Sequence, residues 1–190
     1  MIALQYHDVR VRINWGTNLN GRTFEAYAKW AHVDNVEREF FAERPHDMLI
    51  TQLRYNSPSN GKVQDLVFNG PVKFLAMANP SGTNFFNANN KVKLQANGVD
   101  LEDYTWVQPN LTAITSKQSA PFSSANTSAF LLYPFCFDTS SMQPSGSLNF
   151  SRLDSATMLS QTANIQDPVY AMSYNILRIK DGMGGLLFSD

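Results

Sequence analysis

The sequence predicts an all-β fold, an antiparallel β-sandwich with one short helix and long loops. Short apolar runs with strand-like alternation recur along the chain, polar turns rich in Asn, Ser and Gly divide them, and only one segment has helical signals. Many short strands separated by turns are typical of all-β sandwiches, whereas α/β folds alternate strands with helices. With 190 residues, 43% of them hydrophobic, the chain can bury one sizeable core and is expected to be a single domain.

Nine segments have the composition of strands. No internal repeat or low-complexity linker interrupts the series. This number and spacing of strands favours a sandwich or jelly roll. The expected strands are Ala3 to Asn14, Phe24 to Val33, Met48 to Tyr55, Val63 to Phe68, Val72 to Ala78, Lys91 to Ala96, Ala129 to Phe137, Ser147 to Leu153 and Val169 to Ile179.

The one expected helix begins after Asp34. Asp34 can cap the first turn, Glu37 stands three residues on as in a capping box, and Pro45 helps to end the helix. Asp103 to Thr127 is rich in Ser, Thr, Asn and Pro and has few apolar alternations, which predicts a long ordered loop. A boundary is expected near Trp15 to Arg22, where the polar sequence GTNLNGR separates the first strand from the rest.

Two segments are the most informative: Gln143 to Ala156, QPSGSLNFSRLDSA, and Tyr174 to Gly185, YNILRIKDGMGG. In the first, QPSG predicts a type I turn, and a strand with alternating apolar residues follows it. The alternation falters at Arg152-Leu153-Asp154, where a bulge or an Arg and Asp pair at a strand end would each fit. In the second, an apolar run ends at DGMGG, whose glycines permit positive φ and close backbone approach.

These two segments resemble the carboxy-terminal jelly roll of the major capsid protein of nucleocytoplasmic large DNA viruses, the iridovirus, phycodnavirus and mimivirus group. The resemblance implies a structural protein of an icosahedral capsid, a viral jelly roll that packs beside a partner barrel and trimerises into pseudo-hexagonal capsomers. It also implies contacts with neighbouring capsomers or minor capsid proteins, and a place in the virion shell after synthesis in the host cytoplasm. Further segments are similar in the family's order: Ile2 to Ile13, Val36 to Leu53, Leu66 to Leu75 and Lys91 to Gly98.

The resemblance also predicts a domain arrangement. Family members carry two jelly rolls in one chain, and Ile2 to Ile13 resembles the strand that closes the first. We therefore expect residues 1–15 to be the closing strand of a preceding, mostly absent jelly roll, residues 16–22 a linker, and residues 23–190 the second jelly-roll domain. A fragment, a separately encoded exon, a misassigned start and a single-barrel relative all remain open at this stage.

Composition and charge exclude several classes of function. Fifteen basic residues face sixteen acidic ones without a long run of either sign, so the chain has no electrostatic footprint for nucleic acid or an anionic membrane. A single cysteine, Cys136, cannot form an internal disulfide. The apolar run Ala129 to Phe137 is too short to span a bilayer, and no signal-peptide pattern precedes the first strand. We expect a protein that stays in a reducing compartment.

No catalytic, cofactor-binding or metal-binding site is expected. His7 precedes Asp8, His32 lies near Asp34, and His46 precedes Asp47, but neither a His-x-His pair nor an HExxH helix is present. Cys136 lies in an apolar run and is expected to be an inert core thiol. No GxSxG elbow occurs, and Gly182-Met183-Gly184-Gly185 lacks the Lys and Ser or Thr of a phosphate loop.

Two classes of function remain, a capsid structural protein and a ligand-binding β-sandwich such as a lectin, the second suggested by Tyr104 and Trp106, which could stack on sugar rings. The paired QPSGSLNFSRLD and GMGG segments favour the first. Sequons at Asn110, Asn126 and Asn149 are attributed to chance in an Asn-rich chain. Most aromatic residues are expected to fill the core and the rest to make subunit contacts, the residues in question being Trp15, Trp30, Trp106, Phe85, Phe86 and Phe122.

Overall fold

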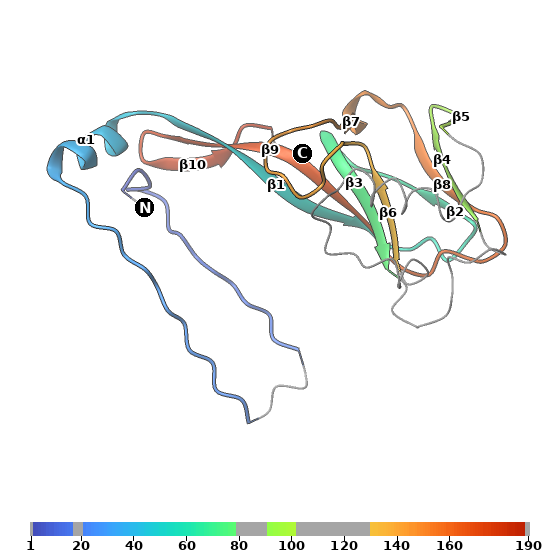
Figure 1. Cartoon of the computed structure of the whole chain (residues 1–190), viewed down its shortest axis with the longest axis horizontal. Coiled ribbons are helices and arrows are strands. Elements are labelled where there is room, and N and C mark those ends of the chain that lie inside the picture. The colour runs from blue at the N-terminus through green and yellow to red at the C-terminus, as the bar shows by residue number, and fades with distance from the viewer. Residues whose placement is uncertain (1, 17–20, 79–90, 102–129, 189–190) are drawn as a thin grey trace. The chain divides into compact units, whose positions relative to one another are not determined.

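A computed structural model describes residues 2–16, 21–78, 91–101 and 130–188 (Figure 1). The chain divides into two compact units, the first formed by residues 1–48 with 176–187 and the second by residues 49–175 with 188–190. The loop expected at 103–127 lies outside the described residues. The elements are α1 (Asn35–Glu43), β1 (His46–Asn56), β2 (Val63–Asp65), β3 (Pro71–Ala78), β4 (Val92–Ala96), β5 (Val99–Asp100), β6 (Phe130–Pro134), β7 (Leu148–Asn149), the 3-10 helix η2 (Phe150–Arg152), β8 (Ala156–Ser160), β9 (Val169–Lys180) and β10 (Met183–Leu186).

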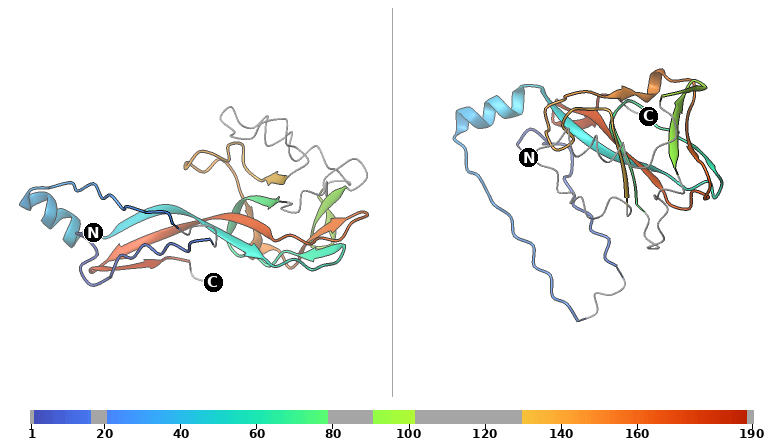
Figure 2. Two further views of the ribbon diagram at one scale, coloured as in Figure 1. Left: turned by 90° about the horizontal axis from the view of Figure 1, so that it is seen from below. Right: turned by 45° about the vertical axis from the view of Figure 1, so that its right-hand side comes forward.

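The strands form two sheets, which confirms the all-β prediction. One sheet has the order β1-β9-β3-β6, with β10 on β9 and β7 on β3. The other has the order β2-β8-β4-β5. Every register given for a strand pair is antiparallel. In both views of Figure 2 the long strands β1 and β9 lie side by side, as the sheet order requires.

Both sheets contribute to a common hydrophobic core in the second unit. In β4, Val92 and Leu94 are buried and Lys93 between them is half-buried, the period of a strand with one face turned inward. Met158 of β8 is the register partner of Leu94 and is also buried. Burying each large apolar side chain contributes roughly 1.5–3 kcal/mol. The cluster consists of Leu66, Phe68, Val72, Leu75, Met77, Val92, Leu94, Leu131, Phe150, Ala156, Met158, Ile165, Val169 and Ala171.

Two-residue turns connect two of the hairpins. Asn97 and Gly98 join β4 to β5 with φ of 52° and 77°, and Asp181 and Gly182 join β9 to β10 with φ of 53° and 77°. Positive φ at both central positions is the geometry that matches the twist of antiparallel strands, and Asn-Gly and Asp-Gly are the sequences that adopt it most readily. The positive φ expected in the DGMGG segment is therefore found at Asp181 and Gly182.

The QPSG segment differs from its prediction. The chain bends at residues 142–143, but no hydrogen-bonded turn forms at 143–146. The glycine is nevertheless required, because a Cβ on Gly146 would lie 2.7 Å from the carbonyl oxygen of Phe135. The strand expected from Ser147 to Leu153 is also shorter: it ends after Asn149, and η2 follows. The backbone N–H of Ser151 donates to Oδ1 of Asn149 at 3.1 Å, so a 3-10 turn replaces the expected bulge or Arg and Asp pair.

The predicted helix is confirmed, with Asp34 as its cap: the carboxylate accepts from the backbone N–H of Glu37 at 2.8 Å. By contrast, the strands expected at Ala3 to Asn14 and Phe24 to Val33 are wrong. Both stretches are coil in Figure 1 and carry no strand. A strand needs a neighbour that pairs with its backbone N–H and C=O groups, and no ladder pairs with either stretch in the described part of the chain.

Candidate assembly surface

The three histidines do not form a chemical site. His7 accepts a hydrogen bond at Nδ1 from the backbone N–H of Gly184 at 3.2 Å, and Nε2 of His46 donates to the carbonyl oxygen of Phe41 at 2.9 Å. His32 is exposed. Among the described residues, no three His, Cys, Asp or Glu side chains come together as metal ligands would. The absence of a catalytic, cofactor or metal site over the whole chain stays a prediction.

Cys136 lies in the connection from β6 to β7, which contacts β3 where the backbone N–H of Phe135 donates to the carbonyl oxygen of Lys73 at 2.9 Å. It is buried, and so is Lys73, which is 3% exposed. Lys73 is buried because the register of β3 shifts at this point, between Val72 and Phe74. Its Nζ donates to the carbonyl oxygen of Ser141 and lies 5.5 Å from the ring centroid of Tyr174. The ammonium thus holds the 135–147 connection against β3.

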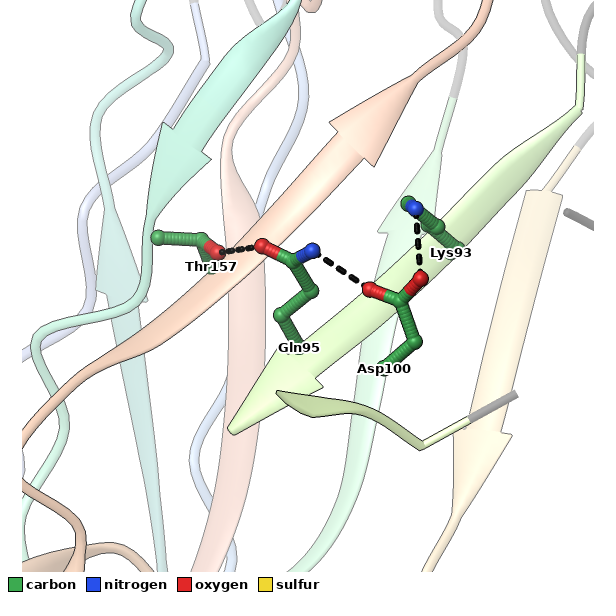
Figure 3. Close-up of polar contacts among 4 residues, drawn as sticks. All are labelled: Lys93, Gln95, Asp100 and Thr157. Carbon is green, nitrogen blue, oxygen red and sulfur yellow. Dashed lines mark hydrogen bonds and ion pairs between the residues drawn. The ribbon is translucent and has the colours of Figure 1, made fainter. Parts of the chain in front are cut away.

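The exposed side of the second sheet carries a small polar network (Figure 3). Nζ of Lys93 donates to the carboxylate of Asp100 at 2.7 Å, and the side-chain amide of Gln95 donates to the same carboxylate. The hydroxyl of Thr157 on β8 donates to Oε1 of Gln95 at 3.4 Å. The hydrogen bond from Lys93, and then the one from Gln95, lower the pKa of Asp100. The network ties β5 and β8 to β4, and its members act as structural groups.

The largest set of exposed apolar side chains lies on two stretches without secondary structure, residues 8–16 and 21–33, named here the extended segments. Val11, Tyr27 and Trp30 are 86%, 88% and 71% exposed. More exposed apolar side chains than single scattered ones are typical of protein interaction sites. The full set on these segments is Val9, Val11, Ile13, Trp15, Phe24, Tyr27 and Trp30.

A groove lies along the end of the second extended segment, within the first unit. It has a volume of about 580 Å³ and is lined mainly by apolar groups, among them Ile2, Trp30 and Phe41. Lys29 and Arg38 also line it. Apolar surface with aromatic groups and a few charges matches the composition of subunit interfaces.

The sequence indicated this surface only in part. Trp15 and Trp30 belong to a group of aromatic residues of which most were expected in the core and the rest in subunit contacts, and both are exposed. Val9, Val11 and Ile13 were missed as contact residues, although they alternate with Arg10 and Arg12, because the alternation predicted a buried strand face. Several candidates lie outside the described residues: Phe85, Phe86, Tyr104, Trp106, Phe122, Asn110 and Asn126.

In the third sequon, at Asn149, two side chains have structural roles. The side chain of Asn149 caps η2, and Oγ of Ser151 accepts from the backbone N–H of Gly70 at 2.7 Å. These contacts engage Oδ1 of Asn149 and the hydroxyl of Ser151 in local structure. Within the described residues, no helix is long and apolar enough to cross a membrane.

Comparisons with known proteins show what the chain is similar to. The family described as large eukaryotic DNA virus major capsid protein matches residues 37–185. The major capsid protein of Pyramimonas orientalis virus is 30% identical over 226 residues, covering 100% of this chain and 57% of that protein. The major capsid protein of Paramecium bursaria Chlorella virus 1 is 26% identical over 273 residues, covering 100% of this chain and 62% of that protein.

A solved structure shows the same fold. PBCV-1 VP54, a crystal structure fitted into a cryo-EM reconstruction of the virophage Sputnik, matches with a TM-score of 0.70 and 25% identity, covering 100% of this chain and 66% of that chain. The sandwich is thus a viral jelly roll. This chain spans less than two thirds of the length of these relatives. Because the family match covers more than half of the sequence, the chain belongs to the family of large eukaryotic DNA virus major capsid proteins.

Proposed function

We propose that the chain is a structural module of an icosahedral viral capsid and trimerises into pseudo-hexagonal capsomers. Its partners are then further copies of itself, neighbouring capsomers and minor capsid proteins. The protein is a component of the virion shell, made in the host cytoplasm, and it is not an enzyme. Family membership and the exposed apolar side chains of the extended segments support this proposal.

The extended segments carry the argument. Their apolar side chains are exposed on backbone that no strand ladder covers in the described structure. Such a surface has a favourable free energy of burial, about 25 cal/mol for each Å² removed from water. Extended backbone can also gain main-chain hydrogen bonds by pairing with a partner strand. Both features favour association with protein.

The domain arrangement expected from the resemblance supports the same role. We propose that residues 1–15 are the closing strand of a preceding jelly roll, residues 16–22 a linker and residues 23–190 the second jelly roll. In this arrangement a preceding module would cover the side chains of Val9, Val11 and Ile13, and in the purified chain another copy would take its place. The near balance of fifteen basic and sixteen acidic residues favours a protein partner over direct contact with nucleic acid.

A carbohydrate-binding function has less support. That alternative depended on Tyr104 and Trp106, which lie outside the described residues. The family match and the capsid relatives favour the capsid role instead.

Light scattering on the purified chain tests the proposal. We expect a mass above that of the monomer, rising with concentration toward the trimer. Val11→Asp places a charge in the extended segments and should weaken this association. Val67→Asp is the matched control, because Val67 is 75% exposed but lies in the second unit, outside the extended segments.

Two results would count against the proposal. A wild-type chain that stays strictly monomeric at all concentrations contradicts self-association. Equal effects of Val11→Asp and Val67→Asp contradict the assignment of the contact surface to the extended segments. Circular dichroism of each variant shows whether its β structure is retained, so a misfolded variant is recognised and replaced by Tyr27→Ser.

A further inference from the structure

The β9 and β10 hairpin holds a short stretch of the amino-terminal chain in the first unit. The backbone N–H of Tyr6 donates to the carbonyl oxygen of Gly182 at 3.0 Å. The backbone N–H of Gly184 donates to Nδ1 of His7 at 3.2 Å. Two hydrogen bonds of opposite direction therefore connect residues 6 and 7 to the turn of the hairpin.

The glycines of the hairpin make this approach possible. A Cβ on Gly182 would overlap the ring of Tyr6, and Gly182 is buried although it lies in a turn. A Cβ on Gly184 would lie 2.8 Å from Cδ2 of Leu4. Real Cβ atoms do not pack this closely, so the hairpin is shaped to receive Leu4 and Tyr6.

The bond to His7 depends on the protonation state of its ring. A backbone N–H can only donate, so Nδ1 must carry a lone pair and the ring proton must be on Nε2. A second proton would convert Nδ1 into a donor facing another donor. Histidine is the side chain whose charge ordinarily changes between about pH 5 and 8.

Charged groups lie on the elements next to this contact, and α1 contributes Arg38 and Glu39, which line a hollow with Gln5. On the amino-terminal side, the carboxylate of Asp8 accepts from Nη2 of Arg10 at 2.8 Å. On the hairpin, Nζ of Lys180 lies 4.0 Å from Oδ2 of Asp181. Each side therefore presents one acidic and one basic group, and within the described structure neither pair is bonded to the His7 ring.

We propose that His7 is an acid-sensitive latch that fastens residues 4–7 to the β9 and β10 hairpin when its ring is neutral and releases them when the ring is protonated. This inference is independent of trimer formation. It assigns a conformational role to the glycines of the DGMGG segment.

Amide hydrogen exchange of the full chain, followed by NMR, tests the latch. Protection factors corrected for intrinsic exchange are measured at about pH 7.5 and about pH 5, on either side of the ordinary histidine titration. We expect the protection of Gly184 and Tyr6 to fall about three- to ten-fold in acid, the range that corresponds to the loss of one hydrogen bond. The amide of Leu187, bonded to the carbonyl of Ile176 at 2.8 Å, should stay protected.

Matched variants distinguish an effect of the His7 ring from a general loss of structure. In His7→Asn the amide oxygen can take the place of Nδ1 at every pH, so the protection of Gly184 should no longer depend on pH. In His7→Ala the amide of Gly184 should be weakly protected at both pH values. His32→Asn, which removes an exposed histidine of the same unit, should respond to pH as the wild type does.

Three outcomes would overturn the proposal. The first is a Gly184 amide in the wild type that is equally protected at both pH values. The second is a His7→Asn variant that loses protection in acid as the wild type does. The third is a parallel loss of protection at Leu187, because the whole hairpin would then be opening rather than the latch.

Discussion

Arg178 and Asp47 form a two-bond ion pair between β9 and β1. Nε of Arg178 donates to Oδ1 of Asp47 at 2.8 Å, and Nη2 donates to Oδ2 at 2.7 Å. This parallel geometry is the most specific arrangement available to an arginine and a carboxylate. The guanidinium holds the pKa of the Asp47 carboxyl below its usual value, chiefly through the hydrogen bonds; desolvation opposes this, and the charge of the guanidinium is the smallest of the three effects.

Removing the carboxylate of Asp47 should make the free energy of unfolding less dependent on pH in the acidic range. The pKa of Asp47 is lowered from 3.8 in the folded state, so its contribution is present above pH 3.8 and is lost as the pH falls through the lower folded value. Asp47→Asn should therefore be less stable than the wild type at neutral pH, and the difference should disappear in strong acid. Urea unfolding at a series of pH values measures this.

A second surface pair controls for the loss of charge alone. Asp8 pairs with Arg10 at 2.8 Å, but both side chains are largely exposed, at 78% and 82%. Exposed pairs contribute little, so Asp8→Asn should change the free energy of unfolding hardly at all. A stability difference for Asp47→Asn that persists unchanged below pH 3.8 would show that the carboxylate charge is not its source.

Gly182→Ala should release the amino-terminal stretch as well as strain the turn. Gly182 and Gly98 occupy the same position in two-residue turns and share a φ of 77°. A Cβ on Gly98 would meet nothing within 4 Å, whereas one on Gly182 would overlap the ring of Tyr6. Both variants should lose roughly 1 kcal/mol through the left-handed backbone.

The comparison of these two variants isolates the contact with Tyr6. Only Gly182→Ala should also abolish the protection of the Tyr6 amide, as measured by hydrogen exchange. If Gly98→Ala reduces that protection equally, the contact with Tyr6 is not what Gly182 provides.

Local turn chemistry made much of the fold predictable. Asp34 with Glu37 predicted the helix, and alternation predicted β4, where Val92 and Leu94 are buried. Strands were missed where their sequence is not apolar enough: β8 reads ATMLS and β10 reads MGGL. These strands form because neighbours pair with them, and a local pattern does not contain that information.

In the extended segments the prediction failed in the opposite direction, because strands were predicted there and none forms. Val9, Val11 and Ile13 alternate as strand residues should, yet a strand at residues 3–14 is not formed. Alternation indicates which face of a strand would be buried, but ladder formation depends on a partner elsewhere in space. The sequence therefore indicated the apolar face as a buried one, and only the structure shows that its side chains are exposed. The latch was less predictable still, because the sequence separates His7 and Gly184 widely.

Gly146→Ala should be among the most destabilising glycine substitutions. The backbone has a φ of 145° at Gly146, and a Cβ there would lie 2.7 Å from the carbonyl oxygen of Phe135 and 3.1 Å from Cα of Cys136. Both neighbours are backbone atoms, which cannot turn aside as a side chain can. We expect a loss of about 3 kcal/mol in urea unfolding. Gly61→Ala, whose new Cβ would meet only Oγ of Ser59 at 3.9 Å, should change stability little; a loss as large as that of Gly146→Ala would contradict the steric explanation.

Tyr174→Phe should stabilise the protein. Tyr174 is 7% exposed, and its hydroxyl has no hydrogen-bond partner in the described structure. Burial raises the pKa of this hydroxyl, and the nearby Cys136 and Asp138 raise it further. A buried donor without a partner costs about 1–3 kcal/mol, so deleting it should raise the free energy of unfolding by about 1 kcal/mol, while the ring keeps its contact with Lys73.

Tyr55→Phe is the matched control, because Tyr55 is 64% exposed and its hydroxyl reaches water. The free energy of unfolding of Tyr55→Phe should lie within about 0.5 kcal/mol of the wild-type value. Urea unfolding of both variants at neutral pH gives the comparison. If Tyr174→Phe instead loses more than about 1 kcal/mol, the hydroxyl makes a stabilising hydrogen bond, and the cost assigned to it here is wrong.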